Sequence, residues 1–250
     1  MPKRRRYLII SDIHANHEAL KAVVQFTKRR RYEGIYFLGD LVGYGASPNP
    51  VTTYMRRHKR VFSVRGNHDK VASGLETPDN FNAAAKHAAE WTLQKLTPEN
   101  MAFLKSLPEG PLCVDNGVAL CHGSYLNEDA YLFSDFDGFR NFEAGDFKIC
   151  FFGHTHFPCV LEEADQGMTL WPLKGDLVEI PLLPGARYMI NPGSVGQPRD
   201  RNPHASFGEY YPDAGRFVLH RVPYDVKRAA ERIRKARLPE NLANRLFIGT

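Results

Sequence analysis

The sequence has no apolar run long enough to cross a membrane and no clear export signal. Its longest apolar runs, Tyr7 to Ile10 and Ile149 to Phe152, fall far short of the roughly 20 residues that span a bilayer. The basic stretch Met1 to Arg6 is followed by only a short apolar run before Asp12, which is too little for a secretory signal. These absences predict a soluble protein that stays in the cytoplasm.

Cysteine is also scarce, and the four cysteines form no recognisable motif. None has CxxC spacing, and three sit in or beside apolar strand-like runs, where buried free thiols are common. We therefore expect reduced, structural cysteines, which suits a cytoplasmic location. They are Cys113, Cys121, Cys150 and Cys159.

The remaining composition is that of an ordinary globular protein. The chain has 250 residues, of which 43% are hydrophobic and 24% charged, so it can bury a sizeable core and we expect one domain over residues 1–250. The net charge of +5 comes largely from Lys3 to Arg6 and Lys227 to Arg237. No nucleic-acid-binding motif accompanies this charge, so a terminal tag and a solvated helix face explain it without a specific nucleic-acid partner.

Five short apolar runs are each followed by a polar cluster. Runs of four or five residues rich in Val, Ile, Phe and Tyr are typical of buried strands, and amphipathic stretches at 18–30 and 50–58 predict helices between the first three. Ligands of open α/β sheets bind outside the carboxyl ends of the strands, so the clusters predict one site. They are Ser11-Asp12-Ile13-His14, Gly39-Asp40, Gly66-Asn67-His68-Asp69, His122-Gly123 and Gly153-His154-Thr155-His156.

The rest of the chain predicts more helices and a second sheet. Residues 82–96 and 98–107 read as helices that either cap the site or, more simply, pack on the sheet. A helix follows Asp225 to about residue 236, and a short basic helix follows Pro239. From residue 159 onward six strand-like runs favour a second, largely antiparallel sheet, with a hairpin turn at 212–215. The runs are 159–162, 168–172, 177–180, 187–190, 205–210 and 216–221.

The polar clusters together indicate a metal site, although each one alone is weak evidence. Imidazole and carboxylate ligands suit zinc, iron or manganese, and the absence of cysteine from every cluster argues against a structural zinc site. The potential ligands exceed the needs of one ion and fit two ions if one carboxylate bridges them. They are Asp12, His14, Asp40, Asn67, His122, His154 and His156.

This ordered set resembles the calcineurin-like metallophosphoesterase superfamily, whose motifs are D-x-H, G-D, G-N-H-[ED], a lone H and G-H-x-H, and within it the small bacterial and archaeal phosphodiesterases. The resemblance spans residue 7 to about residue 200. It implies an α/β fold, a four-layer αββα sandwich of two mixed β-sheets flanked by helices. It also implies two divalent metal ions, with manganese favoured over iron and zinc, and a hydroxide shared between them as the nucleophile for in-line attack.

The resemblance further assigns roles to the site residues. Asp40 would bridge the metals, and His68 would be left as a cationic general acid for the leaving oxygen, or else be a satisfied core histidine. The first metal would be held by Asp12, His14 and His156, and the second by Asn67, His122 and His154. The other histidines are expected to be exposed or capping, with His87 the one a cap helix could aim at substrate; they are His17, His58, His87, His204 and His220.

Two glycine-containing loops, 41–45 and 191–201, are candidates for substrate contacts. Their glycines would let backbone approach a ligand closely, although plain turn chemistry explains them equally well. Tyr44, Arg199 and Arg201 are the candidate substrate-binding side chains, because a guanidinium fits a phosphate.

The second motif bears on the substrate. Protein serine/threonine phosphatases usually read G-D-x-V-x-R-G there, whereas this chain has Gly43 and Tyr44 at the x and R positions. This departure argues against a protein phosphatase. The resemblance to the small bacterial and archaeal phosphodiesterases implies a phosphodiester or phosphoanhydride substrate of nucleotide type, with a protein phosphatase or a phosphomonoesterase as the alternative. A non-catalytic protein-binding scaffold of the same fold is a weaker alternative, because every ligand position holds a competent residue. The sequence does not indicate an oligomeric state.

Overall fold

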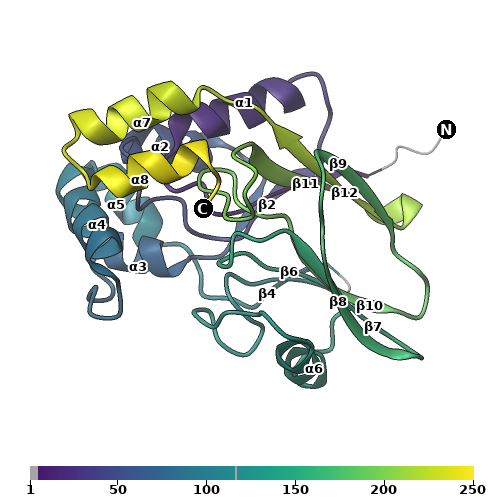
Figure 1. Cartoon of the computed structure of the whole chain (residues 1–250). Helices are drawn as coiled ribbons and strands as arrows, with labels where there is room; N and C mark the ends of the chain where they lie inside the picture. Colours follow the sequence, from purple (N-terminus) through teal and green to yellow (C-terminus); the bar gives the residue numbers. More distant parts are fainter. Residues whose placement is uncertain (1–4, 116) are drawn as a thin grey trace.

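Two six-stranded β-sheets pack face to face in the computed structural model, which describes residues 5–115 and 117–250 (Figure 1). In order across the sheet, sheet A contains β3 (Val61–Ser63), β2 (Gly34–Phe37), β1 (Tyr7–Ile10), β11 (Ala205–Tyr211), β12 (Arg216–Val222) and β9 (Leu177–Pro181). Sheet B contains β4 (Leu112–Asp115), β5 (Val118–Leu120), β6 (Ile149–Phe151), β10 (Arg187–Asn191), β7 (Cys159–Ala164) and β8 (Gly167–Pro172).

Helices cover both outer faces, which confirms the predicted four-layer αββα sandwich. Helices α1 and α2 pack on sheet A, and α7 packs on α1. Helix α6 covers sheet B, and the other helices lie at one end of the sandwich (Figure 1). Among the described residues, none of these helices is both long and apolar enough to cross a bilayer. The helices are α1 (His17–Thr27), α2 (Pro48–Arg57), α3 (Asn67–Ser73), α4 (Ala83–Lys95), α5 (Pro98–Lys105), α6 (Asp135–Ala144), α7 (Val226–Lys235) and α8 (Glu240–Asn244), with 3-10 turns at Pro212–Ala214 and Arg245–Phe247.

Alternation along each strand explains why the central strands are apolar throughout. In β1, Ile9 packs between the two sheets, whereas Leu8 and Ile10 face the helices over sheet A. In β2, Tyr36 faces sheet B, whereas its neighbours Ile35 and Phe37 face the helices. Successive side chains point to opposite faces of a sheet, and both faces here are covered, so each position buries an apolar group.

The prediction that the strands after residue 159 form one second sheet is wrong. Only β7, β8 and β10 join sheet B, where they meet β4, β5 and β6; β9, β11 and β12 pair with β1 in sheet A. Every residue of β11 is buried, so this strand needs neighbours on both edges and cover on both faces. Hydrophobic periodicity identifies such a strand but does not specify which sheet it joins.

The parallel strands of both sheets end at the same end of the sandwich. In sheet A the parallel strands are β1, β2 and β3, and in sheet B they are β5, β6 and β10. Their following loops are tied to one another across the two sheets: Val195 N donates to Ser11 O at 3.0 Å, and His122 Nδ1 lies 2.7 Å from Leu38 O. The polar clusters that follow these strands are therefore gathered in one place.

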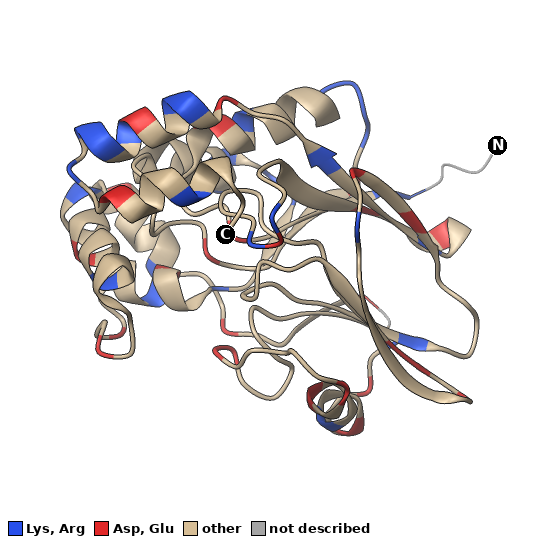
Figure 2. Cartoon of the chain, viewed as in Figure 1, with Lys and Arg blue, Asp and Glu red and all other residues tan. Residues whose placement is uncertain are grey.

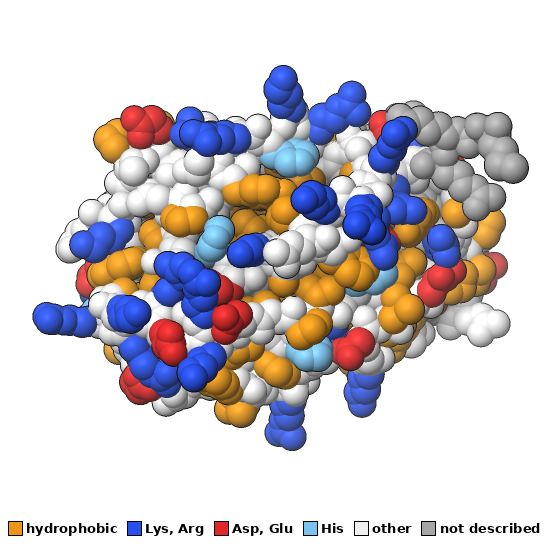
Figure 3. Space-filling view, turned by 90° about the horizontal axis from the view of Figure 1, so that it is seen from above, with side chains coloured by type: hydrophobic (Ala, Val, Ile, Leu, Met, Phe, Trp, Pro, Cys, Tyr) orange, Lys and Arg blue, Asp and Glu red, His pale blue; other side chains and the backbone are white. Residues whose placement is uncertain are grey.

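The positive charge is dispersed rather than gathered into one patch. Figure 2 shows Lys and Arg positions along α7, interrupted by acidic ones. Arg232 of this helix pairs with Glu18 at 2.6 Å and Arg234 with Glu240 at 2.7 Å. On the face drawn in Figure 3, basic side chains are interspersed with acidic and hydrophobic ones. This arrangement is typical of a solvated helix face. In the basic N-terminal stretch, Lys3 and Arg4 lie outside the described residues.

The four cysteines are free, and their burial follows the strand pattern. Cys121, Cys150 and Cys159 are buried, whereas Cys113 on β4 is exposed. Cys150 and Cys159 lie on strands of sheet B and pack in the core beneath α6.

A carboxylate in β11 anchors the central strands of sheet A. Glu209 is 1% exposed and accepts hydrogen bonds from Arg30 Nη1 at 2.8 Å, Tyr211 Oη at 2.7 Å and Tyr32 Oη, and it lies 2.9 Å from His220 Nε2. Burial alone would raise the pKa of this carboxyl, but hydrogen bonds from His220, Tyr32, Tyr211 and Arg30 hold its pKa well below the ordinary value of 4.5.

We expect Glu209→Gln to lower the free energy of unfolding at pH 7 by about 2–4 kcal/mol, because the buried partners lose a charged acceptor. A carboxyl whose pKa is lower in the folded state than in the unfolded state stabilises the fold at pH values above its unfolded-state pKa. This stabilisation is lost as the pH falls through the folded-state pKa. The difference between wild type and variant should therefore shrink below about pH 4.5. Urea unfolding at pH 7 and pH 3.5 measures the loss in unfolding free energy and its dependence on pH. Glu179→Gln, which removes an exposed ion pair with Arg216, should cost under about 1 kcal/mol; a Glu209 effect equally small would contradict the prediction.

Candidate metal centre

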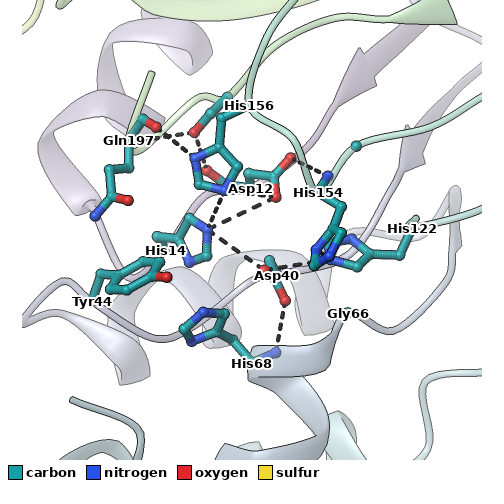
Figure 4. A network of polar contacts seen from close by, with 12 residues as sticks. Asp12, His14, Asp40, Tyr44, Gly66, His68, His122, His154, His156 and Gln197 are labelled. Atoms are coloured by element: carbon teal, nitrogen blue, oxygen red, sulfur yellow. Dashed lines mark hydrogen bonds and ion pairs between the residues drawn. The ribbon is translucent and has the colours of Figure 1, made fainter. Parts of the chain in front are cut away.

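The loops after β1, β2, β5 and β6, together with the start of α3, bring all seven predicted ligands to one place (Figure 4). Apart from Asn67, which is partly exposed, these residues are buried, and their polar atoms point toward a common centre. They are Asp12, His14, Asp40, Asn67, His122, His154 and His156.

The first group of donor atoms comes from Asp12, His14, Asp40 and His156, all within 4.8 Å of one another. His14 Nε2 lies 3.0 Å from His156 Nε2 and 3.6 Å from Asp40 Oδ2. His156 Nε2 in turn lies 3.3 Å from Asp12 Oδ1. Two imidazoles and two carboxylates therefore converge on one point.

Backbone carbonyls fix which nitrogens of these imidazoles carry a lone pair. His14 Nδ1 lies 3.0 Å from Val42 O, and His156 Nδ1 lies 2.6 Å from Gln197 O. Since a carbonyl oxygen only accepts, each Nδ1 is the protonated nitrogen and each Nε2 presents its lone pair to the centre, the arrangement typical of metal ligands. Asp12 Oδ1 is also buried and has no hydrogen-bond partner in the part of the chain that the structure describes. This donor set fits a divalent cation.

The second group comes from Asp40, His122 and His154, with Asn67 beside them. His122 Nε2 lies 3.4 Å from Asp40 Oδ2, 3.3 Å from Asn67 Oδ1 and 3.1 Å from His154 Nδ1. Asp40 Oδ2 is the same oxygen that faces His14 in the first group. Asp40 thus belongs to both groups, which is the position required of a bridging carboxylate.

The backbone at this centre adopts conformations that are uncommon for residues with a side chain. Asp12, His14, Asp40, His154 and His156 have φ values of 53°, 48°, 57°, 63° and 62°. Left-handed φ costs a non-glycine residue on the order of 1–3 kcal/mol and persists where the surrounding structure enforces it, often at functional sites. Here it turns the side chains inward immediately after each strand.

Glycines in the motifs allow the ligands to approach one another. A Cβ on Gly66 would lie 2.1 Å from Asp40 Oδ1, and one on Gly153 would lie 2.0 Å from Ser11 Oγ and 2.8 Å from Asp12 Oδ2. Any side chain at either position would displace a carboxylate of the centre. Gly66 therefore allows contact between neighbouring loops of sheet A, and Gly153 allows contact between loops of opposite sheets.

The pKa values of the buried imidazoles and carboxylates at the centre show how strongly these groups interact. Burial alone would lower the pKa of His122, but the Asp40 carboxylate outweighs burial and raises it to about 10. Burial would raise the pKa of Asp40, but His122 and His68 hold it well below its usual range. Burial and then His122 lower the pKa of His154 to about 3. Cation binding at such a centre displaces the His122 proton, because a metal ligand must be deprotonated.

His68 lies beside the centre rather than within it. Its backbone N donates to Asp40 Oδ1 at 2.9 Å, and its ring packs against Tyr44 and Phe81 at centroid distances of 4.3 and 4.5 Å. Burial in this aromatic surrounding lowers the pKa of His68 to about 4, although Asp40 opposes the shift. In the chain alone this shift favours the neutral imidazole at pH 7. The role of general acid for His68 stays a prediction.

A cavity of about 280 Å³ opens onto the centre. Arg199 and Tyr44 line it, and Arg199 Nη2 donates to Tyr44 Oη at 3.3 Å and to Gln197 Oε1 at 3.1 Å. Arg201 is exposed, does not line this cavity, and its backbone N donates to Gly249 O. The structure thus brings two of the three predicted substrate-binding residues to the cavity.

The glycines of loop 41–45 lie against other residues of the site. A Cβ on Gly43 would lie 2.3 Å from His68 Nδ1, and one on Gly45 would lie 2.3 Å from His14 O. Both glycines therefore let the loop pack on site residues, which carries Tyr44 to the cavity.

Helices α4 and α5 only partly border the cavity. Asn82 and Ala85 at the start of α4 line it, while both helices pack on α2 and α3. Leu104 of α5 joins the core over sheet A. His87 on α4 is exposed and is not among the cavity residues. The simpler expectation, packing rather than capping, describes most of this segment.

Several residues at the site had no role assigned from the sequence. Asp69 accepts hydrogen bonds from Leu41 N at 2.8 Å, Val42 N at 3.2 Å and Gly66 N at 3.1 Å, so it joins the loop of Asp40 to that of His68. Its place in the G-N-H-D motif was the available signal. Tyr131 also lines the cavity, and it lies in a segment for which no element or motif was predicted.

Comparisons with known proteins agree with this geometry. A 40% identical, uncharacterized protein of Methanocaldococcus jannaschii aligns over 96% of this chain and 97% of its own length. The crystal structure of a metallophosphoesterase from Sphaerobacter thermophilus is 38% identical, with a TM-score of 0.87 over 99% of this chain and 100% of that one. A hypothetical protein from Pyrococcus horikoshii, 20% identical, shares the fold with a TM-score of 0.77 over 98% of each chain. The family description of the calcineurin-like phosphoesterase superfamily domain matches residues 6–210. The chain therefore belongs to the calcineurin-like phosphoesterase superfamily.

Proposed function

We propose that this chain is a two-metal phosphodiesterase that hydrolyses a phosphodiester or phosphoanhydride bond in a nucleotide-type substrate. The observation that carries the proposal is the pair of buried donor groups that share Asp40 at the floor of a cavity. One group consists of Asp12, His14, Asp40 and His156, and the other of Asp40, His122, His154 and Asn67.

The donor chemistry supports two divalent ions. Carboxylate, imidazole and carboxamide ligands without thiolate suit manganese, iron or zinc, and we favour manganese. When bound, two such cations supply a more acidic water and positive charge for the phosphoryl oxygens. The protein's part is to hold the ligands rigidly, through the carbonyls of Val42, Leu38 and Gln197 on the imidazoles.

Arg199 is the side chain we assign to the substrate phosphate. Its side chain lines the cavity together with Asp40, His68 and His154, so its positive charge lies beside the donor groups. Tyr44 and Gln197 orient the guanidinium through Nη2. A guanidinium offers paired donors to phosphoryl oxygens and neutralises charge there, which orients the substrate for in-line attack.

His68 is the group we assign to the leaving oxygen. It lines the cavity beside Asp40, within reach of a substrate held by Arg199. Burial keeps its pKa at about 4 in the chain alone, but a bound phosphoryl group adds negative charge beside the ring and raises that pKa. Substrate binding therefore helps to protonate the imidazole when a proton is needed.

The proposal is tested with the purified chain loaded with manganese. We expect it to hydrolyse dinucleoside polyphosphates, cyclic nucleotides or simple diesters such as bis(p-nitrophenyl) phosphate faster than mononucleotides or a phosphopeptide. Metal analysis of the same sample should give two ions per chain. A preference for the phosphopeptide or the mononucleotides would favour the protein-phosphatase or phosphomonoesterase alternative, and inactivity with full metal occupancy would favour a scaffold.

A further inference from the structure

Three exposed aromatic rings form a continuous surface that begins at the metal centre. Tyr131 is 49% exposed, lines the cavity, and stacks on His154 with a centroid distance of 3.9 Å and an interplanar angle of 23°. Phe133 stacks on Tyr131 at 5.5 Å and 11°, and Phe157 meets Phe133 edge-on at 6.4 Å. We call Tyr131, Phe133 and Phe157 the aromatic platform.

The platform is held in place although its rings are exposed. Leu132, between the two stacked rings, is buried in the core beneath α6. Phe133 N donates to Asp137 Oδ2 at 3.1 Å, and Ser134 and Asp137 cap the start of α6. Rings fixed in this way lose little conformational entropy when another ring stacks on them, so the surface is preorganised for a flat ligand.

The charges near the platform indicate that its ligand is uncharged. Glu76 and Asp129 line the same cavity, and both pair with Lys70, at 2.9 and 2.5 Å, while Glu128 pairs with it at 3.0 Å. Arg65 also pairs with Glu128, at 2.9 Å, so three carboxylates meet two cationic side chains and this wall keeps an excess of negative charge. Arg199 supplies positive charge elsewhere in the cavity. An anionic group is therefore favoured at the metal centre and Arg199, and a neutral flat group at the platform.

We propose that the aromatic platform stacks the base of a nucleotide whose phosphoryl group lies at the metal centre. This inference rests on the proposed function and specifies its substrate class. A ribose separates base from phosphate in a nucleotide, so a base can reach Tyr131 while its phosphate stays beside His154. Every base presents a π-face, so such a platform accepts different bases. Tyr131 is thus a specificity-determining residue.

The test compares the methyl ester of adenosine 5′-phosphate with the methyl ester of ribose 5-phosphate, which lacks the base. Neither has an aromatic leaving group that could occupy the platform. We expect the manganese-loaded wild type to prefer the adenosine ester in kcat/KM by about 5- to 150-fold, the factor typical of one stacked base. Tyr131→Ala should lower kcat/KM on the adenosine ester, mainly through KM, by more than it lowers the rate on the ribose ester, so that the preference is lost. Tyr131→Phe should keep the preference.

The control variant is Phe136→Ala, which removes a 68% exposed ring on α6 and should change neither rate. Equal losses on both esters in Tyr131→Ala would overturn the proposal, because Tyr131 would then act only by supporting His154. A change in sedimentation mass in Tyr131→Ala or Phe133→Ala would overturn it in favour of an interface between copies. If the wild type hydrolyses neither these esters nor bis(p-nitrophenyl) phosphate and dinucleoside polyphosphates, the proposed function fails. Calorimetric binding of adenosine 5′-phosphate then tests the platform separately: equal affinity in wild type and Tyr131→Ala overturns it.

Discussion

Replacing Asp40 with asparagine should reduce the manganese-dependent hydrolysis of bis(p-nitrophenyl) phosphate by at least about 10³-fold, which corresponds to several kcal/mol of lost transition-state stabilisation. Asp40 Oδ2 is the one oxygen that faces both donor groups, at 3.6 Å from His14 Nε2 and 3.4 Å from His122 Nε2. Asparagine has nearly the same shape but carries no negative charge, so it cannot offset the repulsion between two neighbouring cations.

The same substitution is mild for the fold, which makes the result interpretable. The oxygen of asparagine can still accept the hydrogen bond from His68 N that Asp40 Oδ1 accepts at 2.9 Å. We therefore expect a folded Asp40→Asn protein that binds fewer than two manganese ions, by metal analysis alongside thermal unfolding. Asp135→Asn, an exposed aspartate on α6, is the matched control and should keep full activity. Unchanged turnover in Asp40→Asn would end the two-metal interpretation.

The location of the site could be predicted because its candidate ligands directly follow the predicted strands. Asp12, Asp40 and His122 each follow a short apolar run, and the carboxyl ends of parallel strands meet at one edge. What could not be predicted was which strands belong to which of the two sheets, since periodicity records burial and not pairing partners. The site is built between the ends of two sheets, and hydrogen bonds such as Val195 N to Ser11 O hold these ends together.

Features that depend on packing between distant segments escaped prediction. The lowered pKa of His68 follows from its burial against Tyr44 and Phe81. The position of His68 after Asn67 in the sequence predicts neither contact. The distance of Arg201 from the cavity depends on how its loop turns after Arg199. By contrast, α6 was missed although Ser134 and Asp137 carry a capping-box signature.

Replacing His68 with alanine should reduce turnover by about 10²–10⁴-fold while leaving two metal ions bound, the range expected when a general acid is removed. His68 contacts Asp40 through its backbone N, which alanine retains. Its side chain is therefore dispensable for holding the bridging carboxylate. His87→Ala, which removes an exposed histidine of α4, should have no effect on turnover and is the matched control.

The dependence on leaving group distinguishes proton donation from every other role of His68. A p-nitrophenolate leaves readily as an anion, whereas a methoxide must be protonated as the bond breaks. The loss in His68→Ala should therefore be larger for a methyl ester than for bis(p-nitrophenyl) phosphate, and His68→Gln, which keeps much of the side-chain volume, should behave like alanine. An equal loss on both substrates would mean that His68 stabilises charge or positions Tyr44, and loss of bound metal would mean that it supports the ligands.

Because burial holds the pKa of His68 at about 4 without substrate, proton donation further requires that the bound phosphoryl group raise that pKa. The rate on the methyl ester should then fall as pH rises through the pKa of the complex, and this fall should disappear in His68→Gln.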